Sequence, residues 1–347
     1  MRMLRLFFSM MLTGTAALAS TTLTIQSAEG GLVTPHLSAT MIPEKAAITL
    51  QNTPPSKRIV ITFDDLPFVN EELSINEIQE KTKALLKTLK KHHVEAIGFV
   101  NEDKLYIKGE IDARIGLLDA WLDAGMELGN HNFGHLGFQN TPLATYEEAV
   151  LKGETVTRWL LQTRGQVPRY YRHPYTQTGP TPEDKAAFEA FLTQHGYTVA
   201  PVTVEHDDFI FASVYRDAQR RGDHAQAKRV QAAYLANLER ALDTFETMSQ
   251  ELFDRQISQI LLLHVNCLNV DSLDVLFIRM KQRGYRFIPL DEALSDTAYT
   301  STDGYIGKFG PSWLRRWADG LGKTLSIKGQ PDPEAWVMKN YEALQNQ

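Results

Sequence analysis

The chain has little cysteine, no strong excess of either charge, and no long apolar run beyond its first twenty residues. One cysteine, Cys267, occurs among 347 residues, so no disulfide forms within the chain and stability must come from the core. The net charge is −6, and no dense run of lysine and arginine offers a surface to nucleic acid. Nucleic acid is therefore excluded as a main partner.

The first twenty residues have the composition of a secretory signal peptide. Two arginines precede an apolar run at residues 6–12, and a small-residue pattern follows at 17–19. This arrangement predicts a signal peptide at residues 1–19 and a secreted or periplasmic protein without a membrane span after cleavage. A permanent membrane anchor is the weaker alternative because the apolar run is short and is interrupted from Thr13.

The rest of the chain divides into a linker, a domain and an extension. Residues 20–57 lack sustained periodicity and are interpreted as a linker or N-terminal arm. Residues 58–294 alternate β-branched apolar runs with segments of helical periodicity, which predicts an α/β domain with a parallel sheet. Within this domain, residues 210–254 are predicted to form a helical insert, and residues 295–347 form a C-terminal extension.

The alternation predicts individual elements in a definite order. Expected strands are 59–63, 96–100, 170–171, 197–204, 257–263 and 285–288; expected helices are 75–91, 115–124, 146–163, 182–195 and 272–283. Such alternation is typical of an α/β barrel or a doubly wound sheet. Polar side chains close behind the strands favour the barrel, which builds its site at the carboxyl ends of its strands. These are Asp64, Asp65, His131, Arg172, Asp208 and His264.

Two adjacent carboxylates end the first predicted strand. A run of β-branched and aromatic residues leads to Asp64 and Asp65, and Pro67 marks the break that follows. Neighbouring carboxylates repel each other, so a nearby positive charge is needed to keep both ionised. A divalent cation bound by one of them meets this need.

Two later histidines are candidate ligands of that cation. His131 and His135 are four residues apart, so on a helical turn both imidazoles would face one side and bind one ion. Asp65 would complete a set of three ligands that leaves positions open for water, as in a hydrolytic site. The alternative is a pair of ordinary core or surface histidines, against which the paired aspartates argue.

The remaining polar residues suit the hydrolysis of an amide. Asp64 is the candidate base for the attacking water, and His264 is the candidate acid for the leaving nitrogen. Arg172 would hold Asp64 ionised, and Asp208 would raise the pKa of His264; the alternative for each is a structural ion pair. The cation and the backbone N–H of Tyr175 would stabilise the oxyanion.

Five motifs, taken in order, make the sequence similar to the polysaccharide deacetylases, the NodB-homology family or carbohydrate esterase family 4. They are Thr62-Phe63-Asp64-Asp65, His131 to His135, Arg172-His173-Pro174-Tyr175, Glu205 to Phe209 and Leu261-Leu262-Leu263-His264. The resemblance implies a distorted (β/α) barrel that removes acetyl groups from N-acetylated glycans. The residues it implies are Asp64, His264, Arg172 and Asp208 in catalysis, Asp65, His131 and His135 as ligands of a divalent cation, zinc above all, and Tyr175, Phe209 and Leu262 in substrate binding.

The sequence also departs from the family pattern. Leu66 replaces the usual glycine after the aspartates, Asn132 and Gly134 are unusual in the second motif, and Glu205 and Phe209 stand for aspartate and tryptophan in the fourth. None of these changes removes a proposed ligand, base or acid. They alter the groove that would face the sugar, so the resemblance does not identify the substrate.

Two further features have two interpretations each. Cys267, three residues after His264, is either a nucleophile or a packed core thiol, and the apolar run before it favours the core. The cluster from Trp313 to Trp317 either stacks on sugar rings or packs on the barrel, and packing is the favoured interpretation. The apolar stripe that begins at Tyr234 is likewise expected to be core.

Three hypotheses for function follow. The first is a secreted, metal-dependent deacetylase of peptidoglycan or chitin-like oligomers. The second is a hydrolase of the same barrel type acting on a non-sugar C–N bond. The third is a glycan-binding protein without catalysis, against which the intact set of aspartates and histidines argues.

Overall fold

The structure is a computed structural model, and it describes residues 57–69, 71–326 and 330–346. The predicted signal peptide, and the predicted arm up to residue 56, lie outside the described residues. The strands are β1 (Lys57–Leu66), β2 (Ile97–Val100), β3 (Glu127–Asn130), β4 (Tyr170–Tyr171), β5 (Thr198–Val199), β6 (Gln259–His264) and β7 (Tyr285–Phe287). The larger helices are α1 (Ile75–His92), α2 (Ile111–Asp123), α3 (Leu143–Lys152), α4 (Thr155–Gln162), α5 (Pro182–Gln194), α6 (Asp208–Arg220), α7 (His224–Phe253), α8 (Cys267–Gln282), α9 (Leu290–Leu294), α10 (Trp313–Gly320) and α11 (Ala335–Gln345).

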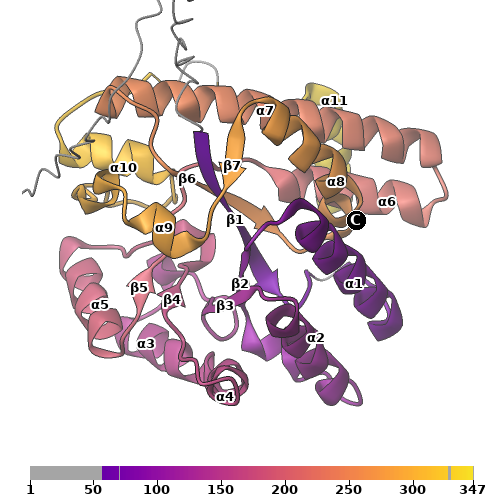
Figure 1. Cartoon of the computed structure of the whole chain (residues 1–347), viewed down its shortest axis with the longest axis horizontal. Coiled ribbons are helices and arrows are strands. Elements are labelled where there is room, and N and C mark those ends of the chain that lie inside the picture. The colour runs from indigo at the N-terminus through magenta and orange to yellow at the C-terminus, as the bar shows by residue number, and fades with distance from the viewer. Residues whose placement is uncertain (1–56, 70, 327–329, 347) are drawn as a thin grey trace, which may run out of the picture. The chain divides into compact units, whose positions relative to one another are not determined.

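All strand pairs in the described sheet are parallel, in the order β5-β4-β3-β2-β1-β6, and β7 also pairs with β1 (Figure 1). Residues 198–204 connect the two edges of this sheet. At the start of this segment β5 pairs with β4, and at its end Val204 forms a parallel bridge with Leu261 of β6. Because these pairings are only a few residues apart, the sheet curls into a distorted barrel, and the predicted fold is confirmed.

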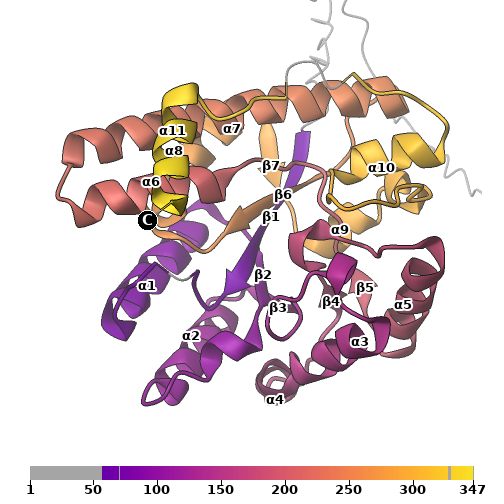
Figure 2. The same cartoon turned by 180° about the vertical axis from the view of Figure 1, so that it is seen from behind.

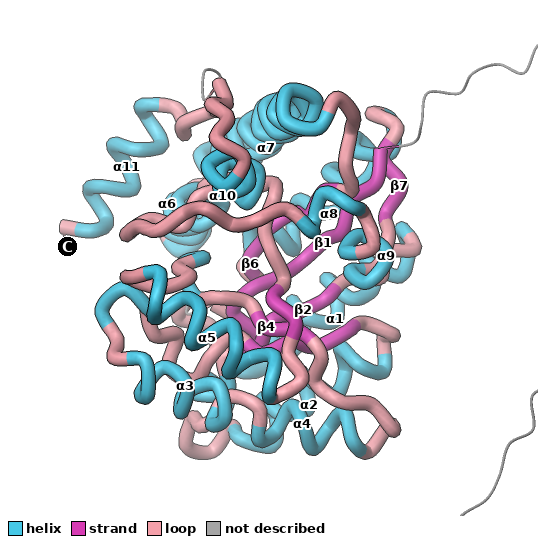
Figure 3. The backbone as a smooth tube through the Cα atoms, turned by 90° about the vertical axis from the view of Figure 1, so that its left-hand side faces the viewer, coloured by secondary structure: helices cyan, strands magenta, loops and turns pink. Residues whose placement is uncertain are grey.

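Strand β1 pairs with three other strands, β2, β6 and β7. Its residues from Ile59 to Asp64 are buried, as expected for a parallel strand covered on both sides. Figure 3 shows the strands enclosed by helices. The neighbouring helix α1 begins at a capping box formed by Ser74 and Glu77, and it turns Leu85 and Leu89 toward the core. Both leucines belong to the same core cluster as Ile61 and Phe63 of β1.

The prediction of a single helix over residues 146–163 is wrong. The structure has two helices there, α3 and α4, separated at Gly153. A Cβ at Gly153 would lie 2.9 Å from the backbone nitrogen of Phe133, so the close packing of this turn requires glycine. The buried carboxylate of Glu102 then accepts hydrogen bonds from the N–H groups of Val156 and Thr157, at 3.0 and 2.6 Å, and starts the second helix.

The insert and the extension both pack on the barrel. Helices α6 and α7 carry most of the insert, and α11 packs against α6 (Figure 2). Tyr234 is fully buried in α7, and Trp313 and Trp317 are 5% and 2% exposed in α10, so the core interpretations of the stripe and of the tryptophan cluster are confirmed. Among the described helices, none has the length and apolarity that crossing a membrane requires.

Candidate active site

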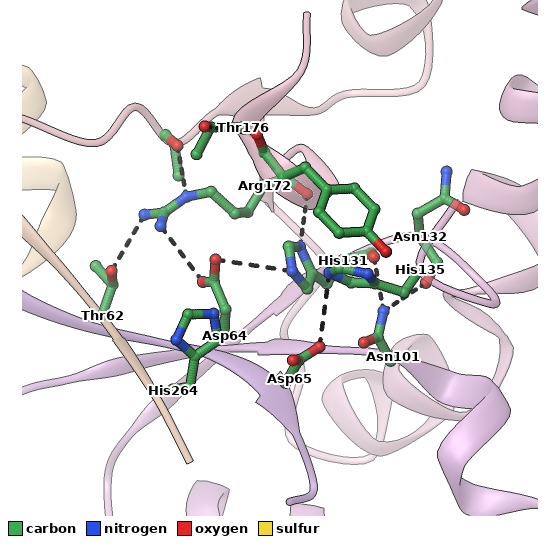
Figure 4. A network of polar contacts seen from close by, with 12 residues as sticks. Thr62, Asp64, Asp65, Asn101, His131, Asn132, His135, Arg172, Thr176 and His264 are labelled. Carbon is green, nitrogen blue, oxygen red and sulfur yellow. Dashed lines mark hydrogen bonds and ion pairs between the residues drawn. The ribbon is translucent and has the colours of Figure 1, made fainter. Parts of the chain in front are cut away.

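The site lies at the carboxyl ends of the central strands, as the sequence predicted. Asp64 and Asp65 lie near the carboxyl end of β1, just before its last residue, Leu66, and Asp65 has a left-handed backbone with φ of 70°. Asp64 is paired in register with His264 of the adjacent strand β6, so the candidate base and acid lie side by side. Figure 4 shows these side chains converging with His131, His135 and Arg172 from other segments.

The two histidines do not lie on a helical turn, so this part of the prediction is wrong. They belong to the loop after β3, in which Asn132, Gly134 and His135 have φ of 66°, 77° and 49°. Three left-handed residues within four positions exclude a right-handed helix. The loop nevertheless brings the two rings together, with centroids 5.0 Å apart. The two histidines therefore do meet, but the conformation of this loop brings them together and not the periodicity of a helix.

Asp65, His131 and His135 offer one ligand atom each, and these atoms all lie within 4.8 Å of one another. Nδ1 of His131 is 2.8 Å from the carbonyl oxygen of Arg172, so this nitrogen donates and Nε2 keeps its lone pair for a cation. Oδ1 of Asp65 is buried and lies 3.1 Å from the ammonium nitrogen of Lys104 and 3.8 Å from Nε2 of His135. One carboxylate and two imidazoles are a donor set that fits a divalent metal such as zinc.

The protonation states of these groups also suit a metal site. Burial lowers the pKa of His131 and of His135 to about 4, so both rings are neutral at pH 7. Burial acts to raise the pKa of Asp65, but the Lys104 ammonium and the neighbouring histidines outweigh it and hold the pKa below its usual range. All three groups are therefore ready to donate electron pairs at neutral pH.

Sequence reasoning missed two residues at the end of β2. Nζ of Lys104 lies 3.1 Å from Oδ1 of Asp65, which places a fixed positive charge beside a candidate ligand. Asn101 is fully buried, and its side-chain amide donates to the carbonyl oxygens of His131 and Asn132 at 2.8 and 2.9 Å. Their position in the sequence could have indicated them, because both residues closely follow the strand predicted at 96–100, as the predicted site residues follow other strands.

Arg172 is fully buried and binds Asp64. Its Nη1 is 3.3 Å from Oδ1 of Asp64, its Nε donates to the carbonyl of Ala200 at 2.7 Å, and its Nη2 donates to Thr62 at 3.2 Å. The guanidinium also lies over the ring of Phe99, 4.6 Å from its centroid. Burial raises the pKa of Asp64, and Arg172 opposes the rise. Arg172 thus offsets part of the rise in the pKa of Asp64 and favours its ionised form.

His264 and Asp208 form a second pair. Nδ1 of His264 is 2.7 Å from Oδ1 of Asp208, and the backbone N–H of His264 donates to the other carboxylate oxygen at 2.9 Å. Asp208 is fully buried at the start of α6 and also accepts a hydrogen bond from Asn269 at 2.7 Å. Burial acts to lower the pKa of His264, but Asp208 outweighs this effect and raises it to about 9. The imidazole is therefore protonated at pH 7, as an acid must be.

The three predicted substrate-binding residues line one cleft of about 1040 Å³ that also contains Asp64, Asp65 and His264. Tyr175 has φ of 54°, its side chain is 59% exposed, and its ring packs against His135 with centroids 4.5 Å apart. Phe209 is 47% exposed and Leu262 is half-buried. The structure brings all three together with the candidate catalytic groups.

Cys267 takes no part in this cleft. It is fully buried at the start of α8, and its N–H donates to Glu71 at 2.9 Å. Burial raises the pKa of its thiol well above the usual value, with the carboxylate of Glu71 adding to the rise. The interpretation as a core thiol is confirmed.

Comparison with known proteins supports the resemblance. Residues 51–200 match the family described as polysaccharide deacetylase, so the resemblance predicted from the motifs is confirmed for this part of the chain. The match includes the aspartates, both histidines and Arg172, and it ends before Asp208 and His264. No curated protein matches the chain.

Several solved structures are similar at low sequence identity. The peptidoglycan deacetylase PdaC from Bacillus subtilis is 18% identical over 69% of this chain and 91% of that chain, with a TM-score of 0.43. A family 4 carbohydrate esterase from Streptomyces lividans is 18% identical over 68% and 95%, with a TM-score of 0.42. A CE4 family pseudoenzyme from Bacillus anthracis is 16% identical over 70% and 66%, with a TM-score of 0.41.

Proposed function

Because residues 51–200 match the polysaccharide deacetylases, we propose that this protein is a hydrolase that removes N-acetyl groups from a glycan such as peptidoglycan or a chitin-like oligomer. The observation that carries the proposal is the meeting, in one cleft, of a three-ligand cluster with a separate acid and base. Hydrolysis of an amide needs these parts together, whereas binding of a glycan needs none of them.

Asp65, His131 and His135 would hold a divalent cation, with zinc the best fit to a carboxylate and two neutral imidazoles. Such a cation, when bound, supplies Lewis-acid polarisation and lowers the pKa of water to about 7. The chain's own residues supply the rest of the chemistry, beginning with the position of His131, which the carbonyl of Arg172 orients through Nδ1.

Asp64 would take the proton from the attacking water. It is buried, its carboxylate is paired with the guanidinium of Arg172 at 3.3 Å, and it lines the same cleft as the three ligands (Figure 4). His264, protonated at pH 7 because of Asp208, would deliver a proton to the leaving nitrogen of the sugar. The backbone N–H of Tyr175 is the proposed donor to the tetrahedral oxyanion.

The proposed place of action is outside the cytoplasm. The composition of residues 1–19 is that of a signal peptide. An accessible glycan polymer of the cell envelope is the substrate that such a location would offer.

The test is release of acetate from a panel of N-acetylated glycans, with Asp64→Asn as the matched variant. The wild-type protein should release acetate from at least one glycan, and the variant should lose turnover by at least a hundredfold, as expected for loss of a general base, while it still binds metal. Release that Asp64→Asn leaves unchanged would remove Asp64 as the base. Inert glycans with turnover of small amides would instead favour an amide hydrolase.

A further inference from the structure

The C-terminal extension supplies a wall of the catalytic cleft. The cleft is lined by Phe309, Gly310, Pro311 and Arg315, which follow the barrel in sequence and lie beyond the part that matches the deacetylase family. Among them, Phe309 is 75% exposed, the highest value for the large hydrophobic residues of the described chain. Single exposed apolar residues are common on protein surfaces, so exposure alone assigns no role.

What distinguishes Phe309 is that its backbone is held on both sides. The carbonyl of Lys308, before it, accepts a hydrogen bond from the side chain of Gln177 at 3.0 Å. The carbonyl of Gly310, after it, accepts one from the hydroxyl of Thr176 at 2.5 Å. Both donors belong to the loop that follows Tyr175, so the extension is tied to the loop that carries the proposed oxyanion donor.

Gly310 shows how close this approach is. A Cβ at this position would lie 1.9 Å from the hydroxyl oxygen of Thr176 and 2.2 Å from the carbonyl oxygen of Tyr175. No side chain fits there without moving one of the two segments. The side chain of Arg316, fully buried, adds a hydrogen bond to the carbonyl of Thr176 and another to Thr178 at 2.9 Å.

The result is an exposed aromatic side chain, on a backbone held by hydrogen bonds, at the wall of the cleft that also contains Asp64 and His264. A fixed backbone has no further backbone entropy to lose on binding, and an aromatic side chain has only two torsions to restrict, which makes such a residue an effective contact. A sugar ring has one face made of C–H groups, and an aromatic ring is the side chain best suited to cover it. The ring of Tyr175, also exposed in the cleft, lies on the neighbouring segment.

We propose that Phe309 forms a sugar-binding subsite beside the one that holds the reacting N-acetylated unit, so that the enzyme prefers an oligosaccharide to a single sugar. The subsite takes the apolar face of a neighbouring pyranose ring. This inference rests on the proposed function for the identity of the ligand, and it adds a specificity-determining residue from a segment that follows the barrel.

The experiment compares Phe309→Ala with Phe309→Trp and with Trp159→Ala. Trp159 is the matched control, because it is 57% exposed on α4 and does not line the cleft. Substrates are N-acetylglucosamine and its oligomers up to the hexamer. Phe309→Ala should raise KM for the oligomers about tenfold, the factor expected when one ring face is no longer covered. It should leave kcat, and any activity on the monosaccharide, unchanged.

Phe309→Trp should restore a low KM, and Trp159→Ala should behave as wild type. Oligomer kinetics that do not respond to Phe309→Ala, or a loss that is equal for the monosaccharide, would overturn the inference. Binding of the hexamer, measured by calorimetry, separates this inference from the proposed function. If the affinity for the hexamer depends on Phe309 but no acetate is released, only the proposed deacetylase function is contradicted. If the hexamer neither binds nor releases acetate, the deacetylase function and the subsite are both contradicted.

Discussion

The ammonium group of Lys104 lies 3.1 Å from Oδ1 of Asp65, the carboxylate residue of the three-ligand cluster. A fixed positive charge at this distance repels a divalent ion. It also partly neutralises the paired aspartates in the metal-free protein, and so contributes to keeping Asp65 ionised.

We therefore expect Lys104→Met to tighten metal binding by about tenfold, a modest value because the site is partly solvated. Calorimetric titration of zinc into metal-free protein measures this directly. The control is Lys108→Met, which removes an exposed lysine four residues further along the chain. Weaker binding in Lys104→Met would mean that Lys104 acts mainly by orienting Asp65.

The pair His264 and Asp208 predicts a pH dependence. Asp208 holds the pKa of His264 at about 9, so the protonated acid should persist up to that pH and activity should fall as pH rises through about 9. In Asp208→Asn the imidazole loses its anionic partner, and the falling limb should move to lower pH. The measurement is kcat against pH, and a limb that stays in place would show that another group sets it.

The two metal-ligand histidines predict a second, opposite dependence on pH. Their pKa values are lowered from 6.5 to about 4 in the folded state, so the unfolded chain takes up protons first as pH falls. Their contribution to stability is fully present above pH 6.5 and is lost as pH falls from 6.5 toward 4. Denaturant unfolding of the metal-free protein across this range should show the loss, and a His131→Asn, His135→Asn double variant should show a smaller slope.

The close contact at Gly310 predicts that a larger residue at this position destabilises the fold. Gly310→Ala should lower the free energy of unfolding by about 1–3 kcal/mol, as overpacking does, because the new Cβ would meet the hydroxyl of Thr176. Gly116→Ala is the matched control: nothing lies within 4 Å of its Cβ, and in the interior of α2 the change should stabilise by up to about 1 kcal/mol. Thermal unfolding of both variants measures the difference, and equal shifts would contradict the close contact.

Much of the fold could be predicted because parallel strands in a barrel are apolar and the residues that follow them are polar. The run that ends at Asp64 and Asp65, and the strand that delivers His264, carry this pattern strongly. The break at Gly153 was not visible, because it depends on the contact with Phe133, a residue distant in sequence. Long-range packing of this kind leaves no local periodic signal.

The candidate site was predicted unevenly for a similar reason. Residues with strong motif context, such as His131 and His135, were found although their backbone was assigned to the wrong conformation. Lys104 was missed because a lone lysine after a strand is ordinary until the fold places it beside Asp65. Phe309 was missed because its segment has neither periodicity nor motif. The hydrogen bonds that tie this segment to the loop after Tyr175 are accepted by the neighbouring residues Lys308 and Gly310.

The most direct test of the central claim is metal stoichiometry and acetate release measured together on wild type and on His135→Ala. Asp65, His131 and His135 are the one cluster of this kind among the described residues. We expect one divalent ion per chain in the wild type, and loss of both the ion and acetate release in His135→Ala, with a retained thermal unfolding transition as the check on folding. A variant that releases acetate at the wild-type rate without bound metal would contradict the proposed metal site.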